Sequence, residues 1–164
     1  MTRCHWANPN NPLYIKYHDE EWGVPSYSDD YLFEMLLLES FQAGLSWECI
    51  LNKRESFRKS FDNFNYHKIA NYDELKIKAT IKNAKIFIAI QKEYGSFSNY
   101  IWHFTNNKII KNNTNNIPTH NELSDKISAD LYKRGMRFVG TIIIYSYLEA
   151  IGIINDHELT CSKH

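Results

Sequence analysis

The sequence of 164 residues contains only three cysteines, four prolines and six glycines. Three cysteines in a chain of this length do not provide a disulfide framework. The longest apolar stretch, Ile142 to Ile154, is too short to span a bilayer and is interrupted by Ser146, Glu149 and Gly152. The first residues lack the charged and then apolar pattern of a signal segment. We therefore expect a soluble, cytoplasmic protein without a membrane partner.

The charges of one sign do not exceed those of the other. Lys and Arg together number 19, as do Asp and Glu, so the formal net charge is zero. Net charge alone therefore neither favours nor excludes a nucleic-acid partner. The length fits one domain, residues 1–164, and is sufficient to bury a core. Aromatic residues make up 15% of the chain and concentrate in its first fifty positions.

The sequence lacks the period-two alternation of strands, whereas apolar residues repeat at helical spacing along most of its length. These patterns predict an all-α fold of about six or seven helices. Ser28 and Ser124 are expected to cap helices, and the backbone up to Pro25 is expected to be irregular, with at most one short helical turn. The Asn- and Lys-rich stretch from Thr105 to Asn116 predicts a mobile surface loop.

One carboxylate, Glu39, follows a dense apolar run within the expected helix 29–41. Leu32, Met35 and Leu36 lie seven, four and three residues before it, so the four side chains share one helix face. An ionised carboxylate in such a buried helix is costly unless it has a partner. Glu39 is therefore either a hydrogen-bonded structural residue or a functional group, and its local sequence leaves both alternatives open.

Two cysteines and two histidines near the two ends of the chain suggest a metal site. His157 and Cys161 are four residues apart and would face the same way on one helical turn, whereas Cys4 and His18 bracket the aromatic N-terminal segment. Two thiolates and two imidazoles suit Zn²⁺, and four protein ligands leave no open coordination position, which is typical of a structural site. Spacing alone leaves open that each is an ordinary residue, and His164 lies close enough to Cys161 to compete as a ligand.

Five segments match, in order, a pattern that extends over nearly the whole chain. They are Arg3-Cys4-His5-Trp6, Asp19 to Pro25, Leu38 to Trp47, Lys133 to Thr141, and Asn155-Asp156-His157 followed by Cys161. Together these segments resemble the 3-methyladenine DNA glycosylase I family. The resemblance implies a helix-hairpin-helix glycosylase fold and a monofunctional enzyme, which we expect to be a monomer. Such an enzyme hydrolyses the N-glycosidic bond of 3-methyladenine in alkylated double-stranded DNA, which starts base excision repair.

The resemblance also implies roles for particular residues. Glu39 matches the essential carboxylate that accepts hydrogen bonds from the edge of the flipped base. Gly44 and Leu45 match the turn that fills the gap left in the duplex. The implied ligands of one structural zinc ion are Cys4, His18, His157 and Cys161. The aromatic residues that match the substrate pocket, where their faces would suit a cationic purine, are Trp6, Tyr14, Tyr17, Trp22 and Trp47.

The sequence departs from the family where the DNA-binding hairpin is expected. No glycine occurs between Gly44 and Gly95, so the hairpin turn cannot have its usual form, and about fifteen residues are missing between Leu75 and Lys76. In this family the backbone N–H groups of the hairpin bind DNA phosphates. We therefore expect an intact base pocket with weakened binding of the duplex.

The missing segment leaves two alternatives open. The protein is either a glycosylase or a non-enzymatic, zinc-binding remnant that binds methylated purine but holds DNA poorly. A basic helix face could replace the hairpin, although a solvated helix surface is the simpler interpretation. The residues of that face are Lys76, Lys78, Lys82 and Lys85.

Overall fold

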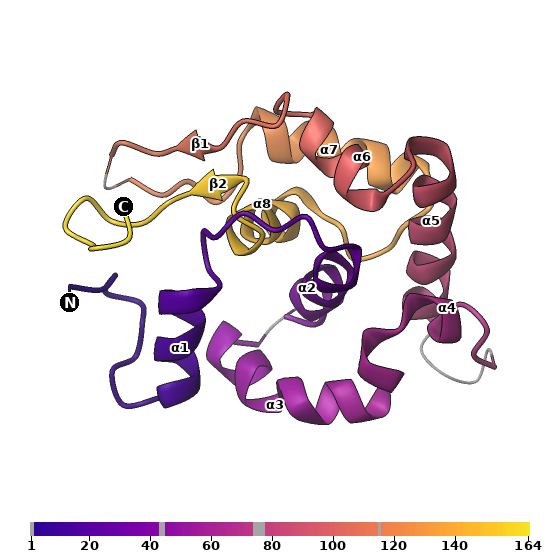
Figure 1. Ribbon diagram of the computed structural model, residues 1–164, viewed down its shortest axis with the longest axis horizontal. Helices are drawn as coiled ribbons and strands as arrows, with labels where there is room; N and C mark the ends of the chain where they lie inside the picture. The colour runs from indigo at the N-terminus through magenta and orange to yellow at the C-terminus, as the bar shows by residue number, and fades with distance from the viewer. Residues whose placement is uncertain (1, 43–44, 74–77, 115) are drawn as a thin grey trace.

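The computed structural model describes residues 2–42, 45–73, 78–114 and 116–164, which are almost entirely helical (Figure 1). The first half contains α1 (Pro12–Glu20), α2 (Asp29–Phe41), α3 (Trp47–Ser60), the 3-10 turn η1 (Asp62–Phe64) and α4 (Tyr66–Ile69). The second half contains α5 (Lys78–Tyr94), α6 (Phe97–His103), β1 (Ile110–Lys111), α7 (Glu122–Lys133), α8 (Thr141–Ala150) and β2 (Ile154–Asn155). None of the helices in these ranges is long and apolar enough to cross a membrane.

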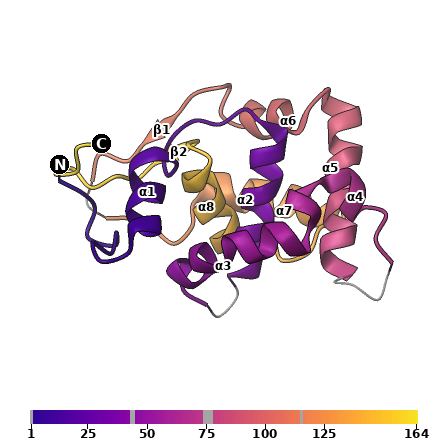
Figure 2. The same cartoon turned by 60° about the horizontal axis from the view of Figure 1, so that its bottom comes forward.

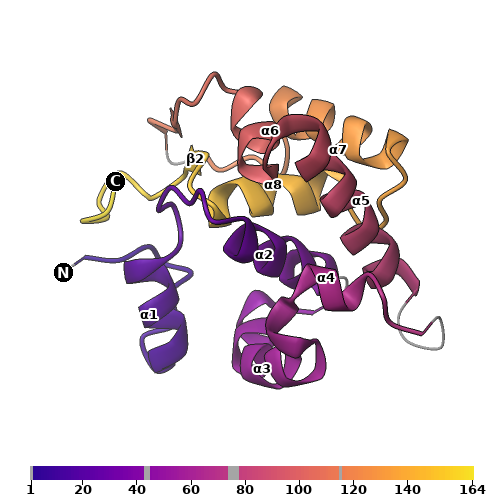
Figure 3. The ribbon, with the colours of Figure 1, turned by 45° about the vertical axis from the view of Figure 1, so that its right-hand side comes forward.

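Helix α2 is the central element of the domain. Ser28 accepts a hydrogen bond from the backbone N–H of Tyr31, and Asp29 and Asp30 lie in the first turn, where negative charge is favourable. Nearly every residue from Leu32 to Ser40 is buried. Figure 3 shows α2 in the middle of the molecule, with α3 below it and α8 above it. Because α2 is covered on all sides, a polar residue on it has to face either a partner or a cavity.

A buried arginine connects α3 to the other helices of the N-terminal half. The Nε atom of Arg54 donates to Glu34 Oε1 at 2.7 Å, and its Nη1 atom donates to Glu21 Oε2 at 2.8 Å. Arg58, one turn further along α3, also donates to Glu34. These charge-assisted hydrogen bonds satisfy a guanidinium that would be costly to bury alone. They fix the position of α3, and therefore of Trp47 at its start, relative to α2.

Three local expectations from the sequence were wrong. The segment up to Pro25 contains the nine-residue helix α1. Asn11 caps the start of this helix by accepting hydrogen bonds from two backbone N–H groups, and Pro12 lies in the first turn. Helix α7 is capped by Asn121, and Ser124 is its partner in a capping box. The expected loop 105–116 includes β1, which pairs in parallel with β2. Strands of two residues are too short to show a period.

The end of α8 is joined closely to the segment that follows α1. The backbone N–H of Gly23 donates to Glu149 O, and that of Ser26 donates to Ile151 O, both at 3.0 Å. Gly152 has a φ of +75°, and a Cβ atom on it would lie 2.3 Å from the backbone of Val24. Glycine is therefore required for this close approach. The two end segments of the chain also meet, since the Ser162 N–H donates to Thr2 O at 3.0 Å, and the C-terminal segment lies on the same side of the molecule as α1 (Figures 1 and 2).

Candidate active site and metal centre

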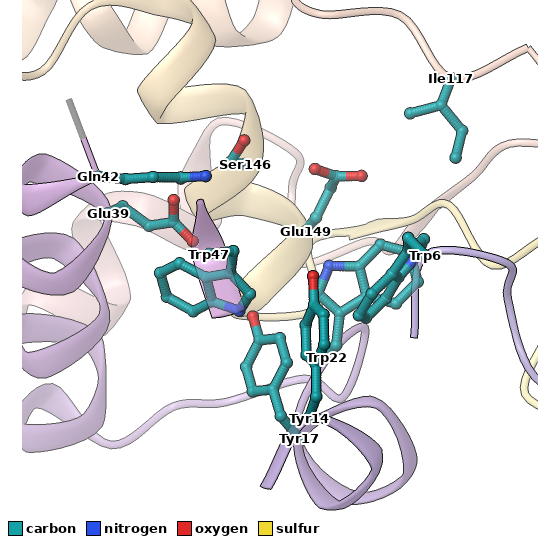
Figure 4. Close-up of a pocket in the computed structure, with 10 residues that line it drawn as sticks. All are labelled: Trp6, Tyr14, Tyr17, Trp22, Glu39, Gln42, Trp47, Ile117, Ser146 and Glu149. Atoms are coloured by element: carbon teal, nitrogen blue, oxygen red, sulfur yellow. The ribbon is translucent and has the colours of Figure 1, made fainter. Parts of the chain in front are cut away.

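A cavity of about 210 Å³ opens among the N-terminal segment, α1, α2, α3 and α8 (Figure 4). The sequence-predicted residues that line it are Trp6, Tyr14, Tyr17, Trp22, Glu39 and Trp47. The lining residues that were not predicted are Gln42, Ile117, Ser146 and Glu149. The structure therefore brings the predicted carboxylate and the five predicted aromatic residues together in one place.

The aromatic walls of the cavity are held by contacts between the rings. The ring centroid of Trp6 lies 4.7 Å from that of Trp22 in an edge-on arrangement and 5.2 Å from that of Tyr14. On another side, the rings of Tyr17 and Trp47 are 5.3 Å apart. Such tilted and edge-on pairs are favourable beyond the area they bury. The Nε1 atom of Trp47 is buried without a hydrogen-bond partner within the described ranges, so it can donate to a ligand.

Glu39 presents an unpartnered carboxyl group to the cavity (Figure 4). Its side chain is 2% exposed, and its Oε2 atom has no hydrogen-bond partner among the residues that the structure describes. Burial raises the pKa of Glu39 to about 8. This geometry favours a functional group over a hydrogen-bonded structural residue. An unsatisfied buried carboxyl facing a cavity is typical of a functional group.

Two further polar residues come from α8. Ser146 and Glu149 are three residues apart, so they share the helix face that lines the cavity. Burial, together with the neighbouring carboxyl of Asp156, raises the pKa of Glu149 well above its usual value. The sequence did contain a signal for this pair, because these residues interrupt an otherwise apolar helix at helical spacing. Gln42, at the end of α2, and Ile117 carried no comparable signal.

The buried Glu39 predicts that the ligand-free protein becomes less stable as pH rises from about 4.5 to about 8. The unfolded chain ionises this side chain at its ordinary pKa, whereas burial holds the pKa at about 8 in the folded protein, so folding takes up a proton in this window. At about 1.4 kcal/mol per pKa unit, the loss amounts to a few kcal/mol.

Denaturant unfolding of the parent and of Glu39→Gln at pH 5 and pH 8.5 measures this effect. Because glutamine cannot ionise, the two proteins should have similar free energies of unfolding at pH 5, and the variant should be the more stable at pH 8.5. An identical pH dependence in both proteins would contradict the assignment.

The structure also brings the predicted metal ligands together. Cys4, His18 and Cys161 are buried, and their ligand atoms lie within 4.8 Å of one another. His157 is outside this group of three, but its ring centroid is 5.2 Å from that of His18, and its Nε2 atom is buried without a partner in the described chain. His164, the possible competitor, places its Nδ1 atom 2.9 Å from the carbonyl oxygen of His157.

The surroundings of this cluster suit a metal ion. The Nδ1 atoms of His18 and His157 contact Asp19 Oδ1 at 2.8 Å and Asn155 Oδ1 at 2.9 Å, which directs both Nε2 atoms into the cluster. Backbone N–H groups donate to Cys4 Sγ and Cys161 Sγ, each at 3.4 Å, which helps to orient both sulfur atoms. The ligand atoms of Cys4, His18 and Cys161 already lie close together, and the Nε2 atom of His157 beside them is buried without a hydrogen-bond partner in the described chain. These four residues therefore fit a bound metal ion.

The metal cluster and the cavity share a wall. The Trp6 ring centroid lies 5.2 Å from that of His18, and the Trp22 centroid lies 4.5 Å from that of His157. Gly23, with a φ of +73°, follows Trp22, and a Cβ atom on it would lie 2.7 Å from His157 Cε1. Glycine at this position therefore lets the imidazole reach the cluster. Holding the cluster together also holds the aromatic wall in place.

The remaining predicted residues lie in or beside residues 43–44 and 74–77, which are outside the described residues. Leu45 is 46% exposed and precedes α3 close to the cavity, which suits a residue that meets a partner. Its neighbour Gly44, predicted to share the wedge role, lies outside the described residues. Leu75 and Lys76, which mark the expected position of the missing segment, also lie outside them.

The fold and the cavity together define a helical domain with an aromatic-walled cavity that contains a buried carboxyl group. The sequence profile of the methyladenine glycosylase family matches residues 6–76 and 72–164. The chain is 38% identical to the DNA-3-methyladenine glycosylase of Haemophilus influenzae and 40% identical to DNA-3-methyladenine glycosylase 1 of Escherichia coli, covering 98% of this chain and 96% of each relative. The protein belongs to the methyladenine glycosylase family.

Solved structures agree with this assignment. A crystal structure of 3-methyladenine DNA glycosylase I superposes with a TM-score of 0.94 at 39% identity, covering 99% of this chain and 100% of the other. A Staphylococcus aureus structure concerned with 3-methyladenine recognition by the same enzyme has a TM-score of 0.92 at 31% identity, covering 99% and 96%. The predicted helical fold is therefore confirmed.

The comparisons also locate a difference in length. The alignment with the Haemophilus influenzae relative extends over 179 positions, whereas this chain has 164 residues, so at least 15 positions have no counterpart here. The two segments matched by the family profile meet at residues 72–76. This break between the two matched segments lies at the position at which the sequence predicts the missing hairpin.

Proposed function

We propose that this protein is a DNA-3-methyladenine glycosylase that acts on alkylated double-stranded DNA. The observation that carries the proposal is the unpartnered Glu39 carboxyl at the side of a cavity walled by Trp6, Trp22 and Trp47. A base that reaches this cavity has to leave the duplex stack, as other enzymes that act on bases require. Membership of the family supports the same reading.

The reaction is the hydrolysis of one bond. The C1′–N9 bond between deoxyribose and base breaks, and its electron pair remains with the base. A 3-methylated adenine is cationic while it is attached to the sugar, so this electron pair neutralises it and makes it a good leaving group. Water adds to C1′ and loses a proton, which leaves an abasic site and free 3-methyladenine. The leaving base needs little help from a general acid.

The side chains of the cavity provide recognition and electrostatic stabilisation. The indole and phenol faces attract the cationic purine, with each close contact contributing about 0.5 to 2 kcal/mol. Glu39 faces the same space, accepts hydrogen bonds from the base edge and ionises when the cation enters, since a nearby positive charge lowers a carboxyl pKa. Unmethylated adenine is disfavoured because it lacks the positive charge and its glycosidic bond is stronger.

We also propose that the cluster of Cys4, His18, His157 and Cys161 binds one structural zinc ion. Its donor set of two thiolates and two imidazoles is the one that zinc prefers. With four protein ligands the ion has no open position for substrate, so its contribution is to fasten the two ends of the chain and the adjoining aromatic wall. Leu45, together with Gly44, is proposed to fill the space that the flipped base leaves in the duplex.

Incubation of the purified protein with alkylated DNA, followed by chromatography of the released bases, tests the proposed function. We expect release of 3-methyladenine and of no unmodified adenine. The non-enzymatic remnant predicts binding of free 3-methyladenine without any release from DNA. Absence of both release and binding would reject the proposal altogether.

A further inference from the structure

Three lysines at the start of α5 form an exposed stripe. Lys78, Lys82 and Lys85 follow one another at spacings of four and three residues, so they share one helix face, and all three are exposed. They surround a hollow of about 260 Å³ whose floor is the buried Ile81. The first turn of α5 has no acidic residue, and none of the three lysines forms an ion pair within the part of the chain that the structure describes.

The connection between α7 and α8 packs directly against this stripe. The side chain of Asn83, which is 1% exposed, donates to Arg137 O at 2.9 Å and accepts from Arg137 N at 2.8 Å. The stem of Lys82 lies against Gly135, with its Cε atom 3.3 Å from the position of a Cβ on that glycine. The start of α5 and this connection are therefore fixed to each other and form one continuous surface.

Phe138 and Arg137, in the segment between α7 and α8, have properties that a solvated surface does not require. Phe138 is 61% exposed and has a φ of +57°, a conformation that is uncommon and costly for an aromatic residue. Beside it, Arg137 is exposed, lies over the Tyr132 ring and has no carboxylate partner in the described ranges. An exposed ring among unpaired cations is typical of surfaces that bind nucleic acid.

The same surface leads into the cavity. Helix α8 begins after Gly140 without a side-chain cap on its first backbone N–H groups, and the hydroxyl of Thr141 at its start donates to the Asp125 carboxylate. Ile142, in its first turn, is 56% exposed and lies one turn before Ser146, which lines the cavity. In Figure 2 the start of α5 and the connection before α8 lie along the lower edge of the molecule.

We propose that these parts form a binding surface for the phosphate backbone of duplex DNA, which we call the α5 surface and define as Lys78, Lys82, Lys85 and Arg137. The surface follows residues 72–76 in the chain, where the two segments matched by the family profile overlap and where the sequence predicts the missing hairpin. It holds the strand next to the flipped base and supplies phosphate contacts in place of the missing segment. The proposal rests on the proposed glycosylase function and identifies where this chain holds its substrate.

The salt dependence of duplex binding tests the α5 surface. The probe is a duplex with a non-cleavable abasic-site analogue, and the test variant carries Lys78→Gln, Lys82→Gln and Lys85→Gln. Each lost phosphate contact reduces the slope of log K against log salt by about 0.9, so we expect a decrease of roughly two to three and at least about tenfold weaker binding at 0.1 M salt. Binding of free 3-methyladenine should not change, which also shows that the variant is folded.

A second triple variant serves as the matched control. It replaces three other exposed lysines by glutamine and so removes the same total charge. These are Lys92, at the other end of α5, and Lys108 and Lys111, which follow α6. Its slope should change by less than about one. Equal slopes for the two triple variants, or an unchanged slope for the test variant, would overturn the α5 surface. Release of 3-methyladenine by the parent protein is measured separately, so failure of the glycosylase function is distinguishable from failure of this surface.

Discussion

Glu39→Gln should lower the rate of 3-methyladenine release by about 100-fold or more, the size of effect seen when one preorganised electrostatic contact is removed from an active site. Glutamine fills the same volume and keeps an acceptor oxygen, but it cannot become an anion when the cationic base enters. Binding of free 3-methyladenine should also weaken. Single-turnover excision from alkylated duplex DNA separates the loss in chemistry from changes in binding or product release.

Two features of the molecule make this experiment decisive. Loss of activity cannot be attributed to unfolding, because the same substitution is expected to stabilise the ligand-free protein at pH 8.5. The matched control is Glu149→Gln, the same chemical change on the α8 side of the cavity. Burial and the neighbouring Asp156 carboxyl raise the pKa of Glu149, which favours its protonated form, so we expect less than about a tenfold loss when an amide replaces it. Comparable losses in both variants would remove the special role of Glu39.

Cys161→Ser should abolish binding of the proposed zinc ion and lower the melting temperature by roughly 10 °C. A metal that binds only the folded protein stabilises it, and a loss of about 4 kcal/mol corresponds to a shift of this size in a domain of about 160 residues. The metal is expected to fasten segments that otherwise meet through few contacts. One is the hydrogen bond from the Ser162 N–H to Thr2 O at 3.0 Å, and another joins His5 to Glu158.

Metal analysis and thermal unfolding measure this prediction together. The native protein should contain one zinc ion per chain, and a chelator should lower its melting temperature without affecting that of Cys161→Ser. Cys49→Ser is the matched control, because Cys49 lies on α3 outside the cluster and should leave the stoichiometry unchanged. A metal content near zero in freshly prepared native protein would reject the zinc site. Because Trp6 and Trp22 contact His18 and His157, loss of the metal should also reduce activity.

The sequence by itself determined the features that depend on local order. Helical periodicity and the cap at Ser28 predicted α2, since these signals arise within a few residues of each other. The apolar run before Glu39 indicated that this carboxylate is buried. The family resemblance, carried by short motifs, correctly indicated the family. The prediction from local sequence was wrong at α1. Asn11 and Pro12 are typical of a helix start, but the density of proline and glycine suggested an irregular backbone.

Only the tertiary structure decided which distant residues meet. Ser146 and Glu149 face the cavity because α8 packs against α2 and its end is joined to the segment after α1, a relation that no local pattern contains. The same holds for Asn83, whose side-chain amide binds the backbone of Arg137 in the segment between α7 and α8. These hydrogen bonds place Phe138 and the start of α8 beside the exposed lysines of α5. Burial and hydrogen bonding between remote segments depend on how the helices pack, whereas periodicity and capping record only what each helix does alone.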